Sequence, residues 1–117
     1  MSKHKQTGIK GEQIAVKFLQ NSGYSILERN WRYGKKEVDI IAKKDDILVI
    51  VEVKTRSNYD FGFPEEAVNG QKQDVLHEAA AAYLEAHPGH TDIRFDIISI
   101  LLNKGEVREI LHFEAAF

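Results

Sequence analysis

The chain has 117 residues and a mass of 13.3 kDa, enough for one domain. A composition of 43% hydrophobic and 29% charged residues is that of an ordinary globular protein and excludes a disordered or fibrous chain. Because there is no cysteine, disulfides and thiolate metal sites are excluded. No apolar run is long enough to span a bilayer, and none follows the basic N-terminus as in a secretory signal, so we expect a cytoplasmic protein with no membrane partner.

The net charge of −2 is distributed unevenly along the chain. Residues 1–36 contain eight lysines or arginines and two acidic residues, a net +6, whereas residues 37–117 carry a net −8. A local basic region attracts phosphates even in a protein of negative total charge. The N-terminal third is therefore either a nucleic-acid-binding surface or a solvated lysine-rich one.

The first predicted element is a helix over residues 7–22, where apolar side chains recur at the spacing of one helical face. Thr7 is a candidate cap at its start, and Gly23 at its end. Residues 1–6 are expected to form a flexible end of the single domain, which comprises residues 1–117.

Three extended segments follow the first helix. Residues 24–29 are a short mixed segment, and residues 37–43 alternate between apolar and polar side chains. Asp45-Asp46 is typical of a hairpin turn into the third segment, residues 47–54. Because that segment opens with five consecutive aliphatic residues, we expect a strand in the middle of the sheet, covered on both faces.

The second half of the chain predicts one helix and two strands. The helix starts at Glu65 or at Asn69 and runs to His87, where Pro88-Gly89 stops it. The two strands, joined by a lysine–glycine turn, are residues 93–102 and 107–113. The order α-β-β-β-α-β-β indicates an α/β domain with one central mixed sheet flanked by helices.

Charged residues at the end of the segment 47–54 carry the strongest chemical signal. Residues two apart on a strand point to the same face, so Glu52 and Lys54 share a face with the aliphatic residues before them. Burying charges is costly unless they are paired or bind a metal. Either the sheet ends here and both side chains reach water, or they form part of a site.

Asp39, inside the preceding strand, favours a site. A hairpin turn at Asp45-Asp46 places Asp39 roughly opposite Glu52, and two facing carboxylates repel each other. A cation between them removes that repulsion, because hard divalent ions prefer carboxylate oxygens. Lys54 beside the pair would stabilise a developing anion or orient a nucleophilic water. The pattern is typical of a metal-dependent site that cleaves phosphodiesters.

Further motifs point to a family. An Asp…Glu-x-Lys hairpin after a helix bearing a glutamate resembles the PD-(D/E)xK nuclease superfamily. More closely, nearly the whole chain resembles the YraN-like family of small bacterial proteins, which are similar in fold to archaeal Holliday junction resolvases. The motifs that carry this resemblance are Gly8-x-x-Gly11-Glu12-x-x-Ala15-x-x-Phe18-Leu19, Gly23-Tyr24, Asn30-Trp31-Arg32, Glu37-Val38-Asp39-Ile40-Ile41-Ala42, Val51-Glu52-Val53-Lys54-Thr55-Arg56 and Arg94-Phe95-Asp96.

The resemblance implies a restriction-endonuclease-like fold and a role for each charged position. Asp39 and Glu52 would ligate Mg²⁺ or Mn²⁺, with the backbone carbonyl of Val53 as a further ligand. Lys54 would help to position or activate the attacking water. Glu12 would complete the acidic cluster from the first helix, although on helical geometry alone it is equally well placed to remain in solvent.

Basic residues are candidate contacts to a nucleic acid. They are Arg32, Lys36, Arg56 and Lys72. Lys36 stands where the family usually has a glycine before its Glu-(Ile/Val)-Asp block. Lys72 lies within the apolar stripe of the second helix and either contacts a phosphate or snorkels to solvent. The Trp31 indole either stacks on a base or belongs to the core.

Two further features have a structural and a functional interpretation. Arg94 and Asp96 share a strand face and are expected to form a structural ion pair. Residues 59–63 are either a mobile lid beside the site or a loop anchored in the core.

We therefore expect a metal-dependent DNA endonuclease, and fold analogy suggests branched or structured DNA as its substrate. A chain of this size would grip a four-way junction as a two-fold homodimer. The alternative is a non-catalytic nucleic-acid-binding module, or a partner of DNA-processing proteins, that keeps its acidic cluster for structural reasons. A protein-interaction adaptor is the third interpretation, which absent or salt-insensitive DNA binding would favour.

Overall fold

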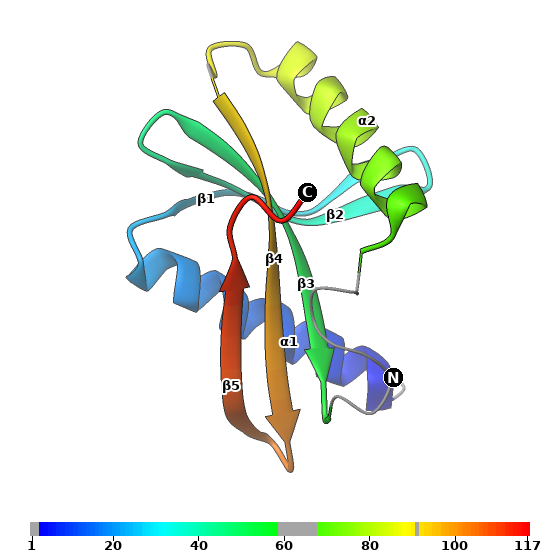
Figure 1. The fold of residues 1–117 in the computed structure, drawn as a ribbon, viewed down its shortest axis with the longest axis vertical. Coiled ribbons are helices and arrows are strands. Elements are labelled where there is room, and N and C mark those ends of the chain that lie inside the picture. Colours follow the sequence, from blue (N-terminus) through cyan, green and yellow to red (C-terminus); the bar gives the residue numbers. More distant parts are fainter. Residues whose placement is uncertain (1–2, 59–67, 91) are drawn as a thin grey trace.

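A computed structural model describes residues 3–58, 68–90 and 92–117, and in it one sheet carries a helix on each face (Figure 1). The predicted order α-β-β-β-α-β-β is confirmed. In chain order the elements are α1 (Lys3–Asn21), β1 (Ser25–Tyr33), β2 (Lys36–Lys44), β3 (Ile47–Arg56), α2 (Gly70–Ala86), β4 (Asp92–Asn103) and β5 (Glu106–Phe113).

The sheet is mixed, with strand order β1-β2-β3-β4-β5 and β3 at its centre. Hairpins join β1 to β2, β2 to β3 and β4 to β5, and all three pairs are antiparallel. The β3–β4 pair is parallel, because α2 returns the chain to the other end of the sheet between them. Asp45 adopts a left-handed φ of 54°, as expected of the hairpin turn predicted there.

Alternation along the strands divides the core into two layers. On one face, Ala15 and Leu19 of α1 pack on a cluster that includes Val49 and Val51. On the other face, α2 packs on a cluster that includes Ile50. Residues 48–51 are fully buried, so the prediction that this strand is covered on both faces is confirmed.

Some predicted boundaries were wrong. Helix α1 begins at Lys3, so Thr7 lies inside the helix and is not its cap. The first residues are lysine, histidine and glutamine, which do not break a helix. Strand β1 continues to Tyr33 rather than ending at residue 29, because its second half pairs with β2.

The start of α2 was one of two alternatives, and the structure selects Asn69. The Asn69 side chain accepts a hydrogen bond of 2.9 Å from the Lys72 amide, as an N-cap does. The helix ends at Ala86, before Pro88. The alternative start at Glu65 and the two interpretations of residues 59–63 lie outside the described residues.

Helix α1 lies unusually close to β3 at Gly11. A Cβ atom at this position would overlap the Thr55 hydroxyl, so only glycine allows the observed approach. In the part of the chain that the structure describes, neither helix combines the length and the apolarity needed to cross a membrane.

Candidate active site

The candidate site lies where β2 and β3 diverge. The β2–β3 ladder runs from Lys44 and Ile47 at the turn to Ile40 and Val51, which is the register predicted from the turn. Beyond that pair, the β1–β2 hairpin and β3 take different directions (Figure 1). Asp39 and Glu52 are the next residues on the two strands, so the sheet opens at these carboxylates.

Asp39 closes the ladder with its side chain. In a continued ladder Val53 would lie opposite Val38, but its N–H donates instead to Asp39 Oδ2, at 2.8 Å. The predicted register of Asp39 and Glu52 is confirmed, although the backbone pairing itself stops one residue earlier, at Ile40 and Val51. Burial raises the pKa of Asp39, while the Val53 amide and the charges of Lys72 and Lys54 act in the opposite direction.

Glu12 turns toward the sheet, as the family resemblance implies. Its carboxyl group lies close enough to the side chains of Asn30 and Asp39 for both to influence its pKa. Partial burial and the negative charge of Asp39 raise the pKa of Glu12.

Glu52 lies in β3 on the α2 side, and only 4% of its side chain is exposed. Burial, followed by the negative charge of Asp39, raises its pKa to about 7. Its Oε1 atom lies 3.5 Å from Lys72 Nζ and 3.8 Å from Lys54 Nζ. Both distances exceed those of a charge-assisted hydrogen bond, so the two lysines compensate the charge only loosely.

The environment of Glu52 overturns the interpretation in which both charged side chains merely reach water. The Lys54 and Lys72 side chains are each 38% exposed, whereas Glu52 is buried. Lys72 does not simply snorkel away from the apolar stripe, since its ammonium group turns to Glu52. Its contact with a phosphate stays a prediction.

The carboxylates of the site are suitable ligands for a hard divalent cation. Their side chains are not, however, arranged as a complete metal site. Glu52 Oε2 is buried and has no hydrogen-bond partner among the described residues, which leaves a carboxylate oxygen available to a cation. Across residues 3–58, 68–90 and 92–117, no three histidine or acidic side chains come close enough together to form a ready-made metal site. Glu12 and Asp39 influence each other's pKa, whereas Glu52 forms ion pairs with the two lysines.

The remaining predicted residues are distributed around this centre. Val53 is buried in the core on the α1 side. Arg32 and Lys36 are exposed at the end of the β1–β2 hairpin, and Arg32 lies 3.9 Å from Glu37. Arg56 is at the end of β3 and lines a cavity there. The structure brings none of these three basic side chains into contact with Glu52.

Two residues of the site had no predicted role. Asn30, at a left-handed φ of 53°, acts to lower the pKa of Glu12, and Gly11 lets α1 approach β3 next to Glu12. Asparagine is enriched at positive φ, but an isolated asparagine in a sequence does not reveal such a position. The Trp31 indole packs edge-on against the Tyr83 ring at 5.2 Å and belongs to the core.

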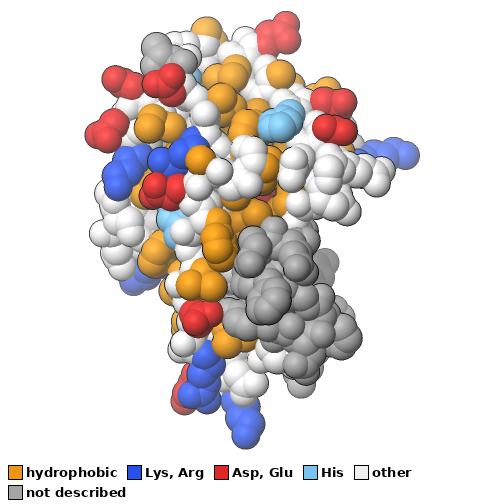
Figure 2. All heavy atoms as spheres, viewed as in Figure 1, with side chains coloured by type: hydrophobic (Ala, Val, Ile, Leu, Met, Phe, Trp, Pro, Cys, Tyr) orange, Lys and Arg blue, Asp and Glu red, His pale blue; other side chains and the backbone are white. Residues whose placement is uncertain are grey.

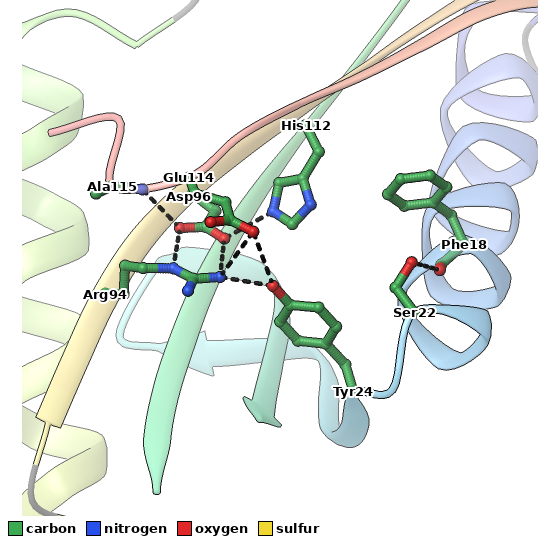
Figure 3. Close-up of polar contacts among 8 residues, drawn as sticks. All are labelled: Phe18, Ser22, Tyr24, Arg94, Asp96, His112, Glu114 and Ala115. Carbon is green, nitrogen blue, oxygen red and sulfur yellow. Dashed lines mark hydrogen bonds and ion pairs between the residues drawn. The ribbon is translucent and has the colours of Figure 1, made fainter. Parts of the chain in front are cut away.

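A second polar cluster lies away from the site and is structural (Figure 3). Arg94 and Asp96 of β4 form the predicted ion pair, at 2.8 Å, and His112 of β5 lies 2.7 Å from the same carboxylate. Burial alone would raise the pKa of Asp96, but hydrogen bonds from His112, Arg94 and the Ala115 amide lower it. These bonds hold the C-terminal residues against β4.

Comparison with known proteins identifies relatives of the whole chain. A model of the uncharacterised protein family UPF0102 matches residues 11–100. A UPF0102 protein of Flavobacterium psychrophilum is 49% identical over 117 residues, covering 100% of this chain and 98% of the relative. A UPF0102 protein of Bacteroides thetaiotaomicron is 46% identical over 117 residues, covering 100% and 96%.

Among solved structures, the chain is similar to that of Pyrococcus furiosus SfsA in complex with Ca²⁺. The TM-score is 0.35 and the sequence identity 16%, over 95% of this chain and 63% of that one. This likeness is too slight to bear on the site.

Proposed function

The chain belongs to the uncharacterised protein family UPF0102, a PD-(D/E)xK nuclease-like group, and from this membership and the acidic site we propose that it is a metal-dependent DNA endonuclease. The observation that carries the proposal is the buried Glu52 carboxylate, which has a second acid, Asp39, nearby and one oxygen without a partner among the described residues. Such an arrangement destabilises a folded protein unless a cation compensates it. Because these acids destabilise the fold, their presence supports a functional role rather than a structural one.

The proposed ligands of Mg²⁺ or Mn²⁺ are the carboxylates of Glu12, Asp39 and Glu52 and the carbonyl of Val53. A bound divalent ion would supply Lewis-acid stabilisation of charge on the phosphate and a water of lowered pKa. Asp39 accepts a hydrogen bond from the Val53 amide, so one of the three acids is already oriented.

Lys54 and Lys72 would act on the substrate. Both ammonium groups lie beside Glu52 and remain partly exposed, so they can reach a phosphate that enters the site from solvent. Lys54 would orient the attacking water or stabilise the negative charge that develops on the phosphate oxygens. Lys72 would bind a phosphate oxygen, and Arg32, Lys36 and Arg56 would contact the backbone on either side.

Branched or structured DNA is the proposed substrate, an extension that rests on fold analogy. A protein measuring 42 × 30 × 27 Å would contact a four-way junction as a two-fold homodimer. The second candidate is a non-catalytic DNA-binding module. It is favoured by the absence, in the described part of the chain, of three acids gathered closely enough to hold a metal, and by the two lysines that already face Glu52.

Cleavage of labelled duplex, single-stranded, flap and four-way-junction DNA, with Mg²⁺ or Mn²⁺ and with a chelator control, tests the proposal. We expect Glu52→Gln and Lys54→Ala to lower the rate by at least about 100-fold, because each removes a group that acts on the reacting phosphate or water. The matched controls are Glu85→Gln and Lys17→Ala, which change exposed side chains on α2 and α1.

Metal-dependent cutting that survives in the controls and is lost in both site variants would support the endonuclease and rank its substrates. A folded wild type that binds DNA but cuts none of the four substrates would favour the binding module. Equal cutting by wild type and Glu52→Gln would reject this site as the catalytic one.

A further inference from the structure

We propose that a basic cavity beside the β4–β5 turn binds backbone phosphates of the DNA strand that passes through the candidate active site. This inference rests on the proposed function and names a subsite for its substrate. The cavity has a volume of about 980 Å³ and lies between the N-terminal half of α1, the end of β3 and the β4–β5 turn.

The lining of the cavity has the chemistry of a phosphate site. It contributes the positive charges of Lys10, Arg56 and Lys104, and none of the described residues that line it is acidic. Asn58 and Asn103 add side-chain amides, which bind phosphate oxygens in nucleic-acid complexes. Figure 2 shows lysine or arginine side chains, with acidic ones beside them, at the lower tip of the molecule. Positive charges that converge from separate elements are stabilised by a bound anion.

Hydrogen bonds between distant parts of the chain hold the walls of the cavity. Lys10 Nζ donates to the Gly105 carbonyl at 2.9 Å and so joins α1 to the β4–β5 turn. Asn103 Nδ2 donates to the Ser57 carbonyl at 3.3 Å and joins the end of β4 to the end of β3. The basic side chains are therefore carried by a connected framework.

The cavity and the acidic site are built on the same two elements. On α1, Lys10 and Glu12 flank Gly11, the residue at which the helix touches Thr55 of β3. On β3, Arg56 follows Glu52 by four residues, about 13 Å along an extended strand. That length spans a few nucleotide steps of a DNA strand, because successive phosphates of one strand lie further apart than the axial rise per base pair.

A strand with its scissile phosphate at Glu52 would thus place phosphates a few nucleotides away in the cavity. Contacts to phosphates carry no base information, so the cavity would position the strand without reading its sequence. Its contribution to binding should depend strongly on salt, because each lysine that neutralises a phosphate releases a condensed counterion.

The test is DNA affinity measured against salt. Fluorescence anisotropy with a labelled four-way junction and a labelled duplex, in EDTA to prevent cutting, gives the slope of log K against log salt concentration. The variants are Lys104→Gln and the double variant with Lys10→Gln. The matched control, Lys17→Gln, removes the same charge from an exposed position on α1 outside the cavity.

We expect the slope for duplex to decrease in magnitude by about 0.9 for each cavity lysine removed and to stay unchanged in Lys17→Gln. Circular dichroism must show native folding of each variant. Lys104→Gln keeps the Lys10–Gly105 bond, so it separates loss of a phosphate contact from loss of the framework.

The outcomes distinguish this proposal from the nuclease proposal. A reduced slope in the cavity variants supports the cavity, even if the wild type cuts no DNA with any metal, a result that would reject only the catalytic function. Slopes that match Lys17→Gln would overturn the cavity, even if wild-type cleavage is vigorous. Absence of salt-dependent DNA binding by the wild type would overturn it as well.

Discussion

At the scale of single residues, the Glu52 carboxylate is buried beside a second acid and is only loosely paired. Its pKa is raised from 4.5 to about 7, chiefly by burial and then by the charge of Asp39. The folded protein therefore binds more protons than the unfolded chain between these two values. In this range the free energy of unfolding falls as the pH rises, and the loss is nearly complete at about pH 8.

Glu52→Gln removes this cost, because glutamine stays neutral at every pH. The raised pKa is equivalent to about 3 kcal/mol at pH 8, and we expect the metal-free variant to gain about 1–3 kcal/mol there. Its stability should also fall less between pH 5 and pH 8. Urea unfolding in EDTA across this range measures both effects.

Exposed Glu106→Gln serves as the control for this comparison. Addition of Mg²⁺ should stabilise the wild type and not Glu52→Gln, since only a ligand that binds the folded state shifts the transition. If Glu52→Gln were less stable than the wild type at pH 8, the ionised Glu52 carboxylate would not be destabilising the fold.

At the scale of elements, the contact between α1 and β3 determines where Glu12 lies. Gly11 and Thr55 touch directly, so the helix crosses the strand at one fixed point. Glu12 is the next residue and reaches Asp39 and Asn30 from there. A larger residue at position 11 would push the helix away from the sheet and the carboxylate away from its partners.

Two glycines of α1 give a matched pair of substitutions. Gly11→Ala should lower the free energy of unfolding by about 1–3 kcal/mol, because its methyl group overlaps the Thr55 side chain. Gly8→Ala meets no atom within 4 Å and should raise stability by about 0.5–1 kcal/mol, since alanine is the better helix former. Thermal unfolding of both variants checks this. Destabilisation by both alanines would mean that the helix does not pack as described.

At the scale of the whole molecule, the two core layers share their strands. Both layers take alternate residues of β2, β3 and β4: Val49 and Val51 face α1, while Leu48 and Ile50 face α2. Separating either helix from the sheet exposes one side of strands whose other side is packed in the second layer. Neither layer can unfold while the other stays intact.

We therefore expect urea to unfold the protein in a single cooperative transition. Trp31, the only tryptophan, reports on the α2 layer, and circular dichroism at 222 nm reports on both helices. The two curves should coincide in midpoint and slope. An earlier loss of helix signal, with unchanged tryptophan emission, would show that α1 unfolds separately.

The residues that sequence reasoning placed correctly are those set by local rules. The element order, the central strand and the β2–β3 register follow from alternation and from the turn at Asp45, which act over a few neighbouring residues. This register was sufficient to predict that Asp39 lies close to Glu52. Side-chain periodicity of two fixes which residues share a face, and so a strand pair is readable from sequence.

The tertiary structure alone decided how the site is assembled. The divergence of β2 from β3, the turn of Glu12 toward Asp39, the reach of Lys72 to Glu52 and the basic cavity all join segments far apart in the chain. Each depends on the angle and distance at which a helix packs on the sheet. This angle and this distance depend on the packing of many side chains at once. At Gly11, for example, α1 approaches β3 closely only because the residue has no Cβ atom.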